Sequence, residues 1–308
     1  MNKQFNYSCA VTSALKQSSP IVALESTVIT HGLPYPQNFE TLSHLENTIL
    51  EEGGTPATIV LIDGVVHIGL DEEDKKLLES RLNDPLEKIQ KLSMRDLALA
   101  MAHRKTGGTT VSATMLLASL AGIEVFATGG IGGVHRDWQT SGDVSMDILA
   151  LAQIPVTVVS AGCKAILDVS ATVEMMESHG VPVLGWQTEI FPTFYSRNSN
   201  ISIDSTASIE DFVRFHRYHK KLRTSKCGIL IANPIPEVSE IPAEKIEPFI
   251  QAALQAAGEK GVKGKAITPF LLDYLARATA GESVEANLAL LENNARLAAK
   301  LAIALKGV

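Results

Sequence analysis

The chain has 308 residues, of which 27 are Lys or Arg and 34 are Asp or Glu, so its formal net charge is −7 at pH 7. The length allows one large domain or two ordinary ones. The mildly acidic balance argues against a protein that binds nucleic acid or a membrane surface through charge alone. The 3 cysteines are too few and too scattered for a disulfide framework or a zinc site, so a reducing, cytoplasmic setting is expected.

Residues 1–19 contain no apolar stretch of the kind that forms the core of a signal peptide. No run anywhere in the chain reaches the roughly 18 apolar residues that a membrane-spanning helix needs. We expect residues 1–19 to be a flexible leader. Residues 20–308 are expected to form a single domain, because no repeat, low-complexity tract or linker divides them.

Hydrophobic periodicity predicts alternating strands and helices. Short apolar runs predict strands at residues 21–24, 58–62, 65–68, 154–159, 181–184 and 228–234. Amphipathic runs predict helices at residues 38–52, 71–82, 97–103, 111–120, 170–179, 209–223, 243–260 and 283–306, with one more opened by Thr268 and Pro269. Asp63 and Gly64 predict a type I′ hairpin turn. The pattern favours a three-layer α/β/α domain around a mixed, largely parallel sheet.

A carboxylate stands at the end of the first predicted strand. Glu25 directly follows residues 21–24, all of which are apolar. Removal from water favours the protonated form of a carboxyl group, which makes Glu25 a candidate general acid. The structural alternative is a glutamate satisfied by backbone amides or by a basic side chain.

Glycine and threonine at residues 106–110 precede the helix predicted at residues 111–120. A helix start of this composition offers N–H groups and hydroxyls to a bound anion. With Lys91 or Arg95 nearby, this segment would hold a phosphate group. Ordinary helix capping explains the same residues as well.

The glycines at residues 129–133 do not form a dinucleotide-binding fingerprint, because its third glycine would fall on His135. The chain also lacks the G-x-x-x-x-G-K-[ST] motif, which argues against P-loop chemistry as well as nicotinamide chemistry. This glycine segment would instead let the backbone approach a ligand closely.

Asp143 and Asp147 are four residues apart. On a helix that starts near Gly142, both carboxylates would lie on one face of the first two turns. Oxygen ligands of this kind suit Mg²⁺ or Mn²⁺ better than zinc. Acidic residues also favour the first turn of a helix for dipole reasons alone, which is the competing interpretation.

Lys164 follows the apolar run at residues 154–159 after a turn of small residues. In open α/β sheets, ligands bind in the crevice beyond the carboxyl ends of such strands. A lysine in that crevice is a candidate nucleophile when it is present as the neutral amine. The alternatives are an ordinary surface lysine or a charge partner for Asp168.

Five sequence blocks carry a resemblance to a known family. They are residues 23–27 with 31–38, residues 107–114, residues 127–136, residues 160–168 and residues 286–290. In this order they resemble the pseudouridine-5′-phosphate glycosidase family, also called indigoidine synthase A-like. The match extends from about Pro20 to the C-terminus, and five ordered blocks are far more specific than any one of them.

The resemblance implies an enzyme with one Mn²⁺ per subunit, or another divalent ion such as Mg²⁺. It would reversibly split pseudouridine 5′-phosphate and water into uracil and ribose 5-phosphate. The family pattern makes Lys164 the nucleophile that bonds to ribose C1′, Glu25 the proton donor and Asp143 the metal ligand. The substrate contacts that it implies are Lys91, Thr110, Val111, His135, Ser145, Met146, Asp147 and Asn287. It also suggests a homotrimer.

Met94, Gly142 and Met146 depart from the family pattern, at places that affect the shape of the nucleobase pocket. Two other functions compete with the family assignment. A Schiff-base lyase or aldolase for another sugar phosphate would share Lys164 but show no dependence on uracil. A catalytically inactive sugar-phosphate sensor is disfavoured, because Glu25, Asp143 and Lys164 are all present.

Overall fold

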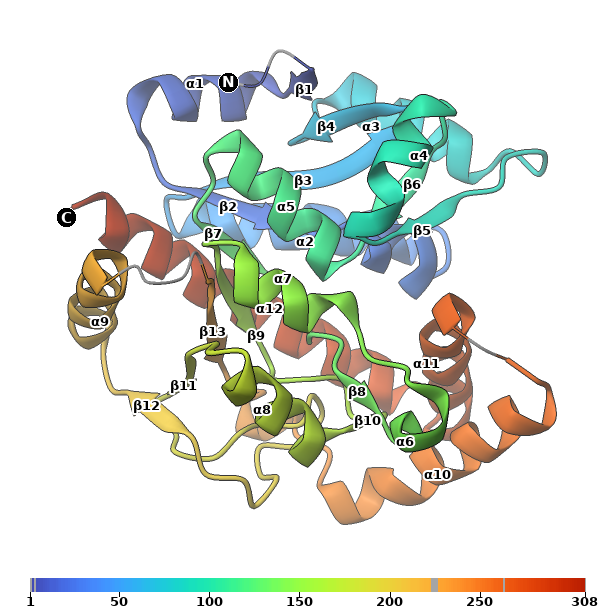
Figure 1. Cartoon of the computed structure of the whole chain (residues 1–308). Helices are drawn as coiled ribbons and strands as arrows, with labels where there is room; N and C mark the ends of the chain where they lie inside the picture. The colour runs from blue at the N-terminus through green and yellow to red at the C-terminus, as the bar shows by residue number, and fades with distance from the viewer. Residues whose placement is uncertain (1, 3, 223–226, 263, 308) are drawn as a thin grey trace.

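The computed structural model describes residues 2, 4–222, 227–262 and 264–307 (Figure 1). Its centre is an 11-stranded sheet with the strand order β1-β4-β3-β2-β7-β9-β13-β11-β12, and β6 pairs with both β3 and β5 beside this path. Neighbouring strands of this sheet pair in parallel, except that the β3–β4 and β3–β6 pairs are antiparallel. A separate two-stranded sheet joins β8 to β10. The sheet is therefore mixed and largely parallel, as the sequence predicts.

The predicted helices lie close to the observed ones, whereas β9 and β11 begin three and two residues later than predicted and several short elements, such as β1, β5 and β12, were not predicted. The strands are β1 Phe5–Tyr7, β2 Ile21–Leu24, β3 Thr55–Ile62, β4 Val65–Ile68, β5 Gln90–Leu92, β6 Gly107–Thr109, β7 Val125–Ala127, β8 Val134–His135, β9 Thr157–Ser160, β10 Leu167–Asp168, β11 Val183–Trp186, β12 Asp204–Thr206 and β13 Ile229–Ala232. The helices are α1 Cys9–Gln17, α2 Gln37–Glu51, α3 Glu72–Leu82, α4 Leu97–Ala102, α5 Val111–Ala121, α6 Trp138–Ser141, α7 Met146–Gln153, α8 Val169–Ser178, α9 Ile209–Leu222, α10 Ala243–Glu259, α11 Ile267–Ala278 and α12 Glu282–Lys306. The helix predicted at residues 209–223 corresponds to α9, and its predicted end at Arg223 lies outside the described residues.

Helices cover both faces of the sheet. On one face α12 packs on β2, β7 and β9 and on the neighbouring helix α2, while on the other α5 packs on β2, β3 and β7 and on α7. Figure 1 shows α5, α7 and α8 in front of the strands and α12 running behind them. Helices α10 and α11, in orange, lie together near the β8–β10 pair. This arrangement confirms the predicted layers of helix, sheet and helix.

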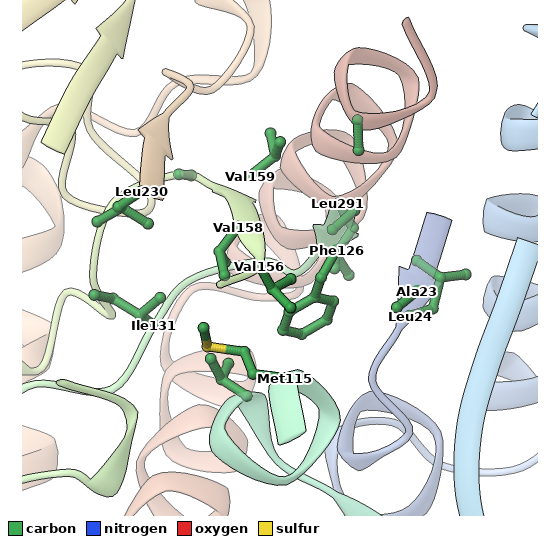
Figure 2. Packing of buried hydrophobic residues seen from close by; sticks show 14 of the residues in the cluster. Ala23, Leu24, Met115, Phe126, Ile131, Val156, Val158, Val159, Leu230 and Leu291 are labelled. Carbon is green, nitrogen blue, oxygen red and sulfur yellow. The ribbon is translucent and has the colours of Figure 1, made fainter. Parts of the chain in front are cut away.

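The core forms where the central strands are apolar on both faces. Phe126 of β7 and Val158 of β9 are fully buried, and Met115 of α5 packs in the same cluster. Figure 2 shows the Phe126 ring with Met115 and Val158 around it. Strands covered on both sides need continuous apolar runs, which is why the sequence marks them so clearly.

The hairpin between β3 and β4 has the turn that its sequence predicts. Asp63 and Gly64 have φ values of 51° and 82°, as a type I′ turn requires. A Cβ atom on Gly64 would lie 2.7 Å from the Cα atom of Arg104, so glycine is required at this position for packing as well as for backbone conformation.

The expectation of a flexible leader at residues 1–19 is wrong for most of that segment. Strand β1 pairs in parallel with β4, and α1 begins at a cap in which the Ser8 hydroxyl accepts a hydrogen bond from the Val11 amide. Val11 and Ala14 are buried in the main core. Two apolar residues on one face of a short helix were enough to anchor the segment, although they form no run that marks a core element.

Among the described residues, no helix combines the length and apolar character needed to cross a membrane.

Candidate active site

A cavity of about 630 Å³ lies beyond the carboxyl ends of β2, β7 and β9. This is the crevice in which open α/β sheets bind their ligands. Nearly every residue predicted for the site lines it, namely Glu25, Lys91, Thr110, His135, Asp143, Ser145, Met146, Asp147, Lys164 and Asn287. The glycine segment also contributes Gly129, Gly130 and Gly132 to the wall. Glu25 and Asn287, 262 positions apart in sequence, thus line one cavity.

Val111 is the predicted site residue that does not line the cavity. Its side chain is 1% exposed and belongs to the main core, at the start of α5. A contact between Val111 and a ligand would therefore have to come from its backbone. The neighbouring Thr110, the N-cap residue of α5, is half-buried and lines the cavity.

Glu25 is held by two hydroxyl groups. It follows β2 directly, and its carboxylate accepts hydrogen bonds from the hydroxyls of Thr27 and Thr128. Thr128 follows β7, the strand next to β2, and is buried. The two hydroxyls fix the orientation of a half-buried carboxyl group that lines the cavity.

Lys164 sits in a tight turn after β9. Its amide donates to the carbonyl of Ile131 at 3.0 Å, and its carbonyl accepts from the Leu167 amide at 3.0 Å. Within this turn Gly162 has φ of 71°, and a Cβ atom there would lie 1.9 Å from the carbonyl oxygen of Pro192. The small residues before Lys164 are therefore needed for the turn that brings its side chain to the cavity.

Asp168 is not the charge partner that one alternative for Lys164 requires. Its carboxylate caps α8, where it accepts a hydrogen bond from the Ala171 amide at 2.9 Å. Lys164 lines the cavity, which argues against the alternative that it is an ordinary surface lysine.

Cys163, beside Lys164, points into the core, and its burial raises the pKa of its thiol to about 12. Because the thiolate is the reactive form, native protein treated with iodoacetamide at pH 8 should remain unmodified at Cys163. The exposed Cys9 should be alkylated, and unfolding in urea should expose Cys163 to the reagent. Peptide mass spectrometry measures all three. Alkylation of Cys163 in native protein at the rate of Cys9 would contradict the assigned burial.

Cationic groups gather at the end of the cavity formed by β5 and α5. The cations are Lys91 of β5 and Arg95, and they line this end together with His31 and Thr110. Burial, followed by the charge of Lys91, lowers the pKa of His31, so this imidazole is neutral at pH 7. The N-terminus of α5, an 11-residue helix, adds its dipole. This end of the cavity suits a phosphate group.

Asp143 and Asp147 do not share a helix face, so that prediction is wrong. Helix α7 begins at Met146, with Ser145 as its N-cap, and Asp143 lies in the extended segment before it. Val144 forms an antiparallel bridge with Val134, which keeps this segment extended. The Asp143 carboxylate lies 3.9 Å from Nε2 of His135, with a side-chain exposure of 37%.

The Asp147 carboxylate is 5% exposed and is bound by backbone amides. It accepts hydrogen bonds from Ser112 N at 3.0 Å and from Gly132 N at 2.8 Å. Asp147 thereby ties the first turn of α5 to the glycine segment. Its place in the site is that of a support between two ligand-facing loops, even though it also lines the cavity.

Replacing Asp147 with asparagine should destabilise the protein by about 1–3 kcal/mol, because one amide would then face an NH₂ group instead of an oxygen. Urea unfolding measures this change in free energy. Asp168→Asn is the matched control, since Asp168 binds one amide as a helix N-cap and asparagine caps as well as aspartate. An Asp147→Asn variant within about 0.5 kcal/mol of the Asp168→Asn variant would show that the two amides do not depend on the carboxylate.

Several residues of the site have no signal in the sequence analysis. Phe194, His179 and Leu272 line the cavity. Leu272 belongs to α11, and this helix also contributes Thr268 and Pro269 to the cavity wall. These residues lie far from the recognised blocks in sequence. For Leu272, the missing information is the set of long-range contacts of α11 with α12 and with the segment Val28–Gly32.

The donor set at Asp143 fits a hydrated divalent ion better than a closed metal site. Within residues 2, 4–222, 227–262 and 264–307, no group of three or more His, Cys, Asp or Glu side chains is arranged to hold a metal. Mg²⁺ and ions like it often bind through one or two carboxylates and keep several waters. The partly exposed Asp143 carboxylate satisfies that requirement.

The fold and the cavity together define a class of protein. A lysine and a hydroxyl-bound glutamate face one cavity at the carboxyl edge of a largely parallel sheet, next to a cationic end. These features are those of an α/β enzyme that acts on a small anionic ligand.

Comparison with known proteins identifies the family. The family model described as "Indigoidine synthase A like protein" matches residues 10–304. The pseudouridine-5′-phosphate glycosidase of Paracoccus denitrificans is 49% identical over 298 residues, covering 96% of each chain. That of Alkaliphilus metalliredigens is 45% identical over 306 residues, covering 99% of this chain and 98% of the relative. The chain is therefore an enzyme that belongs to the indigoidine synthase A-like family.

Solved structures show the same fold. The crystal structure of an indigoidine synthase A-like protein from Thermotoga maritima has a TM-score of 0.88 and 33% identity, covering 99% of this chain and 98% of the other. The prealnumycin C-glycosynthase AlnA, crystallised in complex with ribulose 5-phosphate, has a TM-score of 0.89 and 34% identity, covering 100% of this chain and 98% of the other.

Proposed function

We propose that the protein is a pseudouridine-5′-phosphate glycosidase, which reversibly cleaves the C–C glycosidic bond to give uracil and D-ribose 5-phosphate. The observation that carries the proposal is the meeting of Glu25 and Lys164 at one cavity that also has a cationic end. The names of the relatives at 49% and 45% identity support the same activity. The neighbour crystallised with ribulose 5-phosphate supports a five-carbon sugar phosphate as the ligand.

A carbon–carbon glycosidic bond needs a different route from an ordinary glycoside, because no oxygen or nitrogen joins the sugar to the leaving group. We propose that the neutral amine of Lys164 attacks ribose C1′ while the C1′–O bond of the ring breaks. Glu25 gives its proton to the ring oxygen that is released. Each side chain needs access to the same ligand carbon and its ring oxygen, which one shared cavity allows.

The nitrogen now bonded to C1′ can drive the second bond cleavage. It first loses the proton gained in the attack to the Glu25 carboxylate left by that step, which restores its lone pair. The lone pair then forms a C=N bond as the C1′–uracil bond breaks, and the departing uracil carbon takes up that proton. Water then hydrolyses the Schiff base on Lys164 to release the sugar aldehyde and restore the amine. The cationic end formed by Lys91, Arg95 and Thr110 would anchor the 5′-phosphate, so that binding energy remote from the reaction positions C1′.

Asp143 would hold the divalent cation, Mn²⁺ or Mg²⁺, with water completing its coordination. When bound, such an ion supplies positive charge that orients and polarises polar groups of a ligand. Asn287, Ser145, Met146 and His135 are proposed as further substrate contacts, since all four line the cavity. We also propose that residues 20–308 form a single domain, which β1 and α1 join, and that the enzyme works in the cytoplasm as a homotrimer.

The test is a product assay in both directions. Pseudouridine 5′-phosphate with Mn²⁺ should yield uracil and ribose 5-phosphate in equal amounts, and the two products should recombine. Liquid chromatography with mass detection follows all three compounds. Cleavage of other sugar phosphates without any effect of uracil would favour a Schiff-base lyase. Ligand binding without turnover in either direction would favour an inactive sensor.

A further inference from the structure

Arg136 makes an unusual set of contacts immediately behind Lys164. It follows β8, which pairs with β10 so that His135 lies opposite Leu167. Its guanidinium donates from Nη2 to the carbonyl of Ala165 at 2.9 Å and from Nε to the carbonyl of Leu167 at 3.3 Å. Both carbonyls belong to the turn that carries Lys164. The arginine side chain, which is not among the residues that line the cavity, therefore holds this turn through two of its carbonyls.

The same guanidinium is bound by a carboxylate from a distant helix. Glu247 of α10 accepts from Nη1 at 2.5 Å and from Nη2 at 3.1 Å, each through a different oxygen. Burial opposes ionisation of Glu247, but hydrogen bonds from Arg136 and Gln251 outweigh it and keep the pKa of this carboxyl below its usual range. Glu247 thus remains ionised and fixes the plane of the guanidinium.

Helix α10 packs against α11, and α11 supplies Thr268, Pro269 and Leu272 to the cavity wall. A second ion pair also fixes α10, since Lys245 Nζ lies 2.5 Å from Oε1 of Glu282 in α12. That pair has no contact with the Lys164 turn. The two ion pairs of α10 therefore allow a direct comparison between fixing the helix and fixing the turn.

We infer that Arg136 is a positioning residue that holds the Lys164 turn in its reactive geometry, and that Glu247 holds Arg136 in place for this task. The inference rests on the proposed function, in which Lys164 is the nucleophile. A planar group with five N–H donors can serve two carbonyls and two carboxylate oxygens at once. A lysine ammonium has three donors and no fixed plane, so it cannot replace this set of contacts.

The test compares Arg136→Lys and Glu247→Gln with the control Lys245→Gln, which removes the other ion pair of α10. For each protein we would measure kcat and KM, the thermal unfolding midpoint, and the rate at which borohydride traps ribose 5-phosphate on Lys164 at saturating sugar phosphate. Arg136→Lys should lower kcat and the trapping rate on the order of 10²-fold, because small displacements of a reacting group have effects of this size. KM should change by less than about threefold, since the phosphate anchor is elsewhere.

Glu247→Gln should lower kcat and the trapping rate about tenfold, because glutamine keeps an acceptor but loses the charge-assisted pair. Lys245→Gln should match the wild type in both. Arg136→Lys and Glu247→Gln proteins that trap and turn over at wild-type rates would overturn the inference alone. Equal losses in Lys245→Gln and Glu247→Gln would do the same, because the effect would then come from α10 in general. A wild-type protein that traps no sugar phosphate would instead overturn the proposed function, and this inference with it.

Discussion

Lys164→Ala should lower turnover of pseudouridine 5′-phosphate by roughly 10⁴- to 10⁶-fold, which is the loss expected when the nucleophile of a covalent mechanism is removed. Borohydride reduction in the presence of ribose 5-phosphate and Mn²⁺ should add the mass of the reduced sugar phosphate to the wild type and nothing to the variant. Intact-protein mass spectrometry measures the adduct, and peptide mapping should place it on Lys164. The physical reason is that only a neutral amine at this position can form the C=N bond that releases the uracil carbon.

Lys91→Ala is the matched control, because it removes a second lysine from the same cavity. Lys91 lies at the cationic end, so its loss should raise KM for the phosphorylated substrate while the adduct still forms at high ligand concentration. Circular dichroism would show whether each variant is folded. An adduct on folded Lys164→Ala protein, or none on the wild type, would rule out Lys164 as the Schiff-base residue.

The strands and the two central side chains were predictable because their signals are local. Residues 21–24 are all apolar, and residues 154–159 are apolar except for Thr157, as strands covered on both faces require. Glu25 and Lys164 come shortly after these runs, so their place at strand ends made each a candidate site residue, and the family resemblance assigned both to one site. The hairpin turn was predictable for the same reason, since Asp63 and Gly64 carry the whole signal.

The remaining parts of the site depend on contacts that a single sequence does not record. The spacing of Asp143 and Asp147 fits a helix, but the bridge between Val134 and Val144 extends the chain there and moves the helix start to Met146. Asp147 is bound by amides from two other segments, which spacing does not reveal. The pairing of Arg136 with Glu247 joins residues 111 positions apart. In each case tertiary hydrogen bonds decide the role of a residue whose local sequence allows several.

Glu25→Gln should lower kcat for cleavage of pseudouridine 5′-phosphate by roughly 10²- to 10⁴-fold, the usual contribution of a general acid. Glutamine keeps the shape of the side chain. Its oxygen can accept from one of the two hydroxyls, of Thr27 and Thr128, and its NH₂ group can donate to the other, so the fold and KM should change little. It has no acidic proton to give to the ring oxygen. The adduct between Lys164 and ribose 5-phosphate, whose open-chain aldehyde needs no ring opening, should still form in this variant.

That separation of the two steps makes the experiment decisive. Steady-state kinetics report on ring opening, while borohydride trapping of the free sugar phosphate reports on Lys164 alone. Thr128→Val is the companion variant, since it keeps the carboxyl group of Glu25 but removes one hydroxyl that orients it. Its loss in kcat should therefore be smaller than that of Glu25→Gln, about tenfold for one neutral hydrogen bond. If Glu25→Gln cleaves pseudouridine 5′-phosphate at the wild-type rate, the proton must reach the ring oxygen from another group of the cavity, and the role assigned to Glu25 fails.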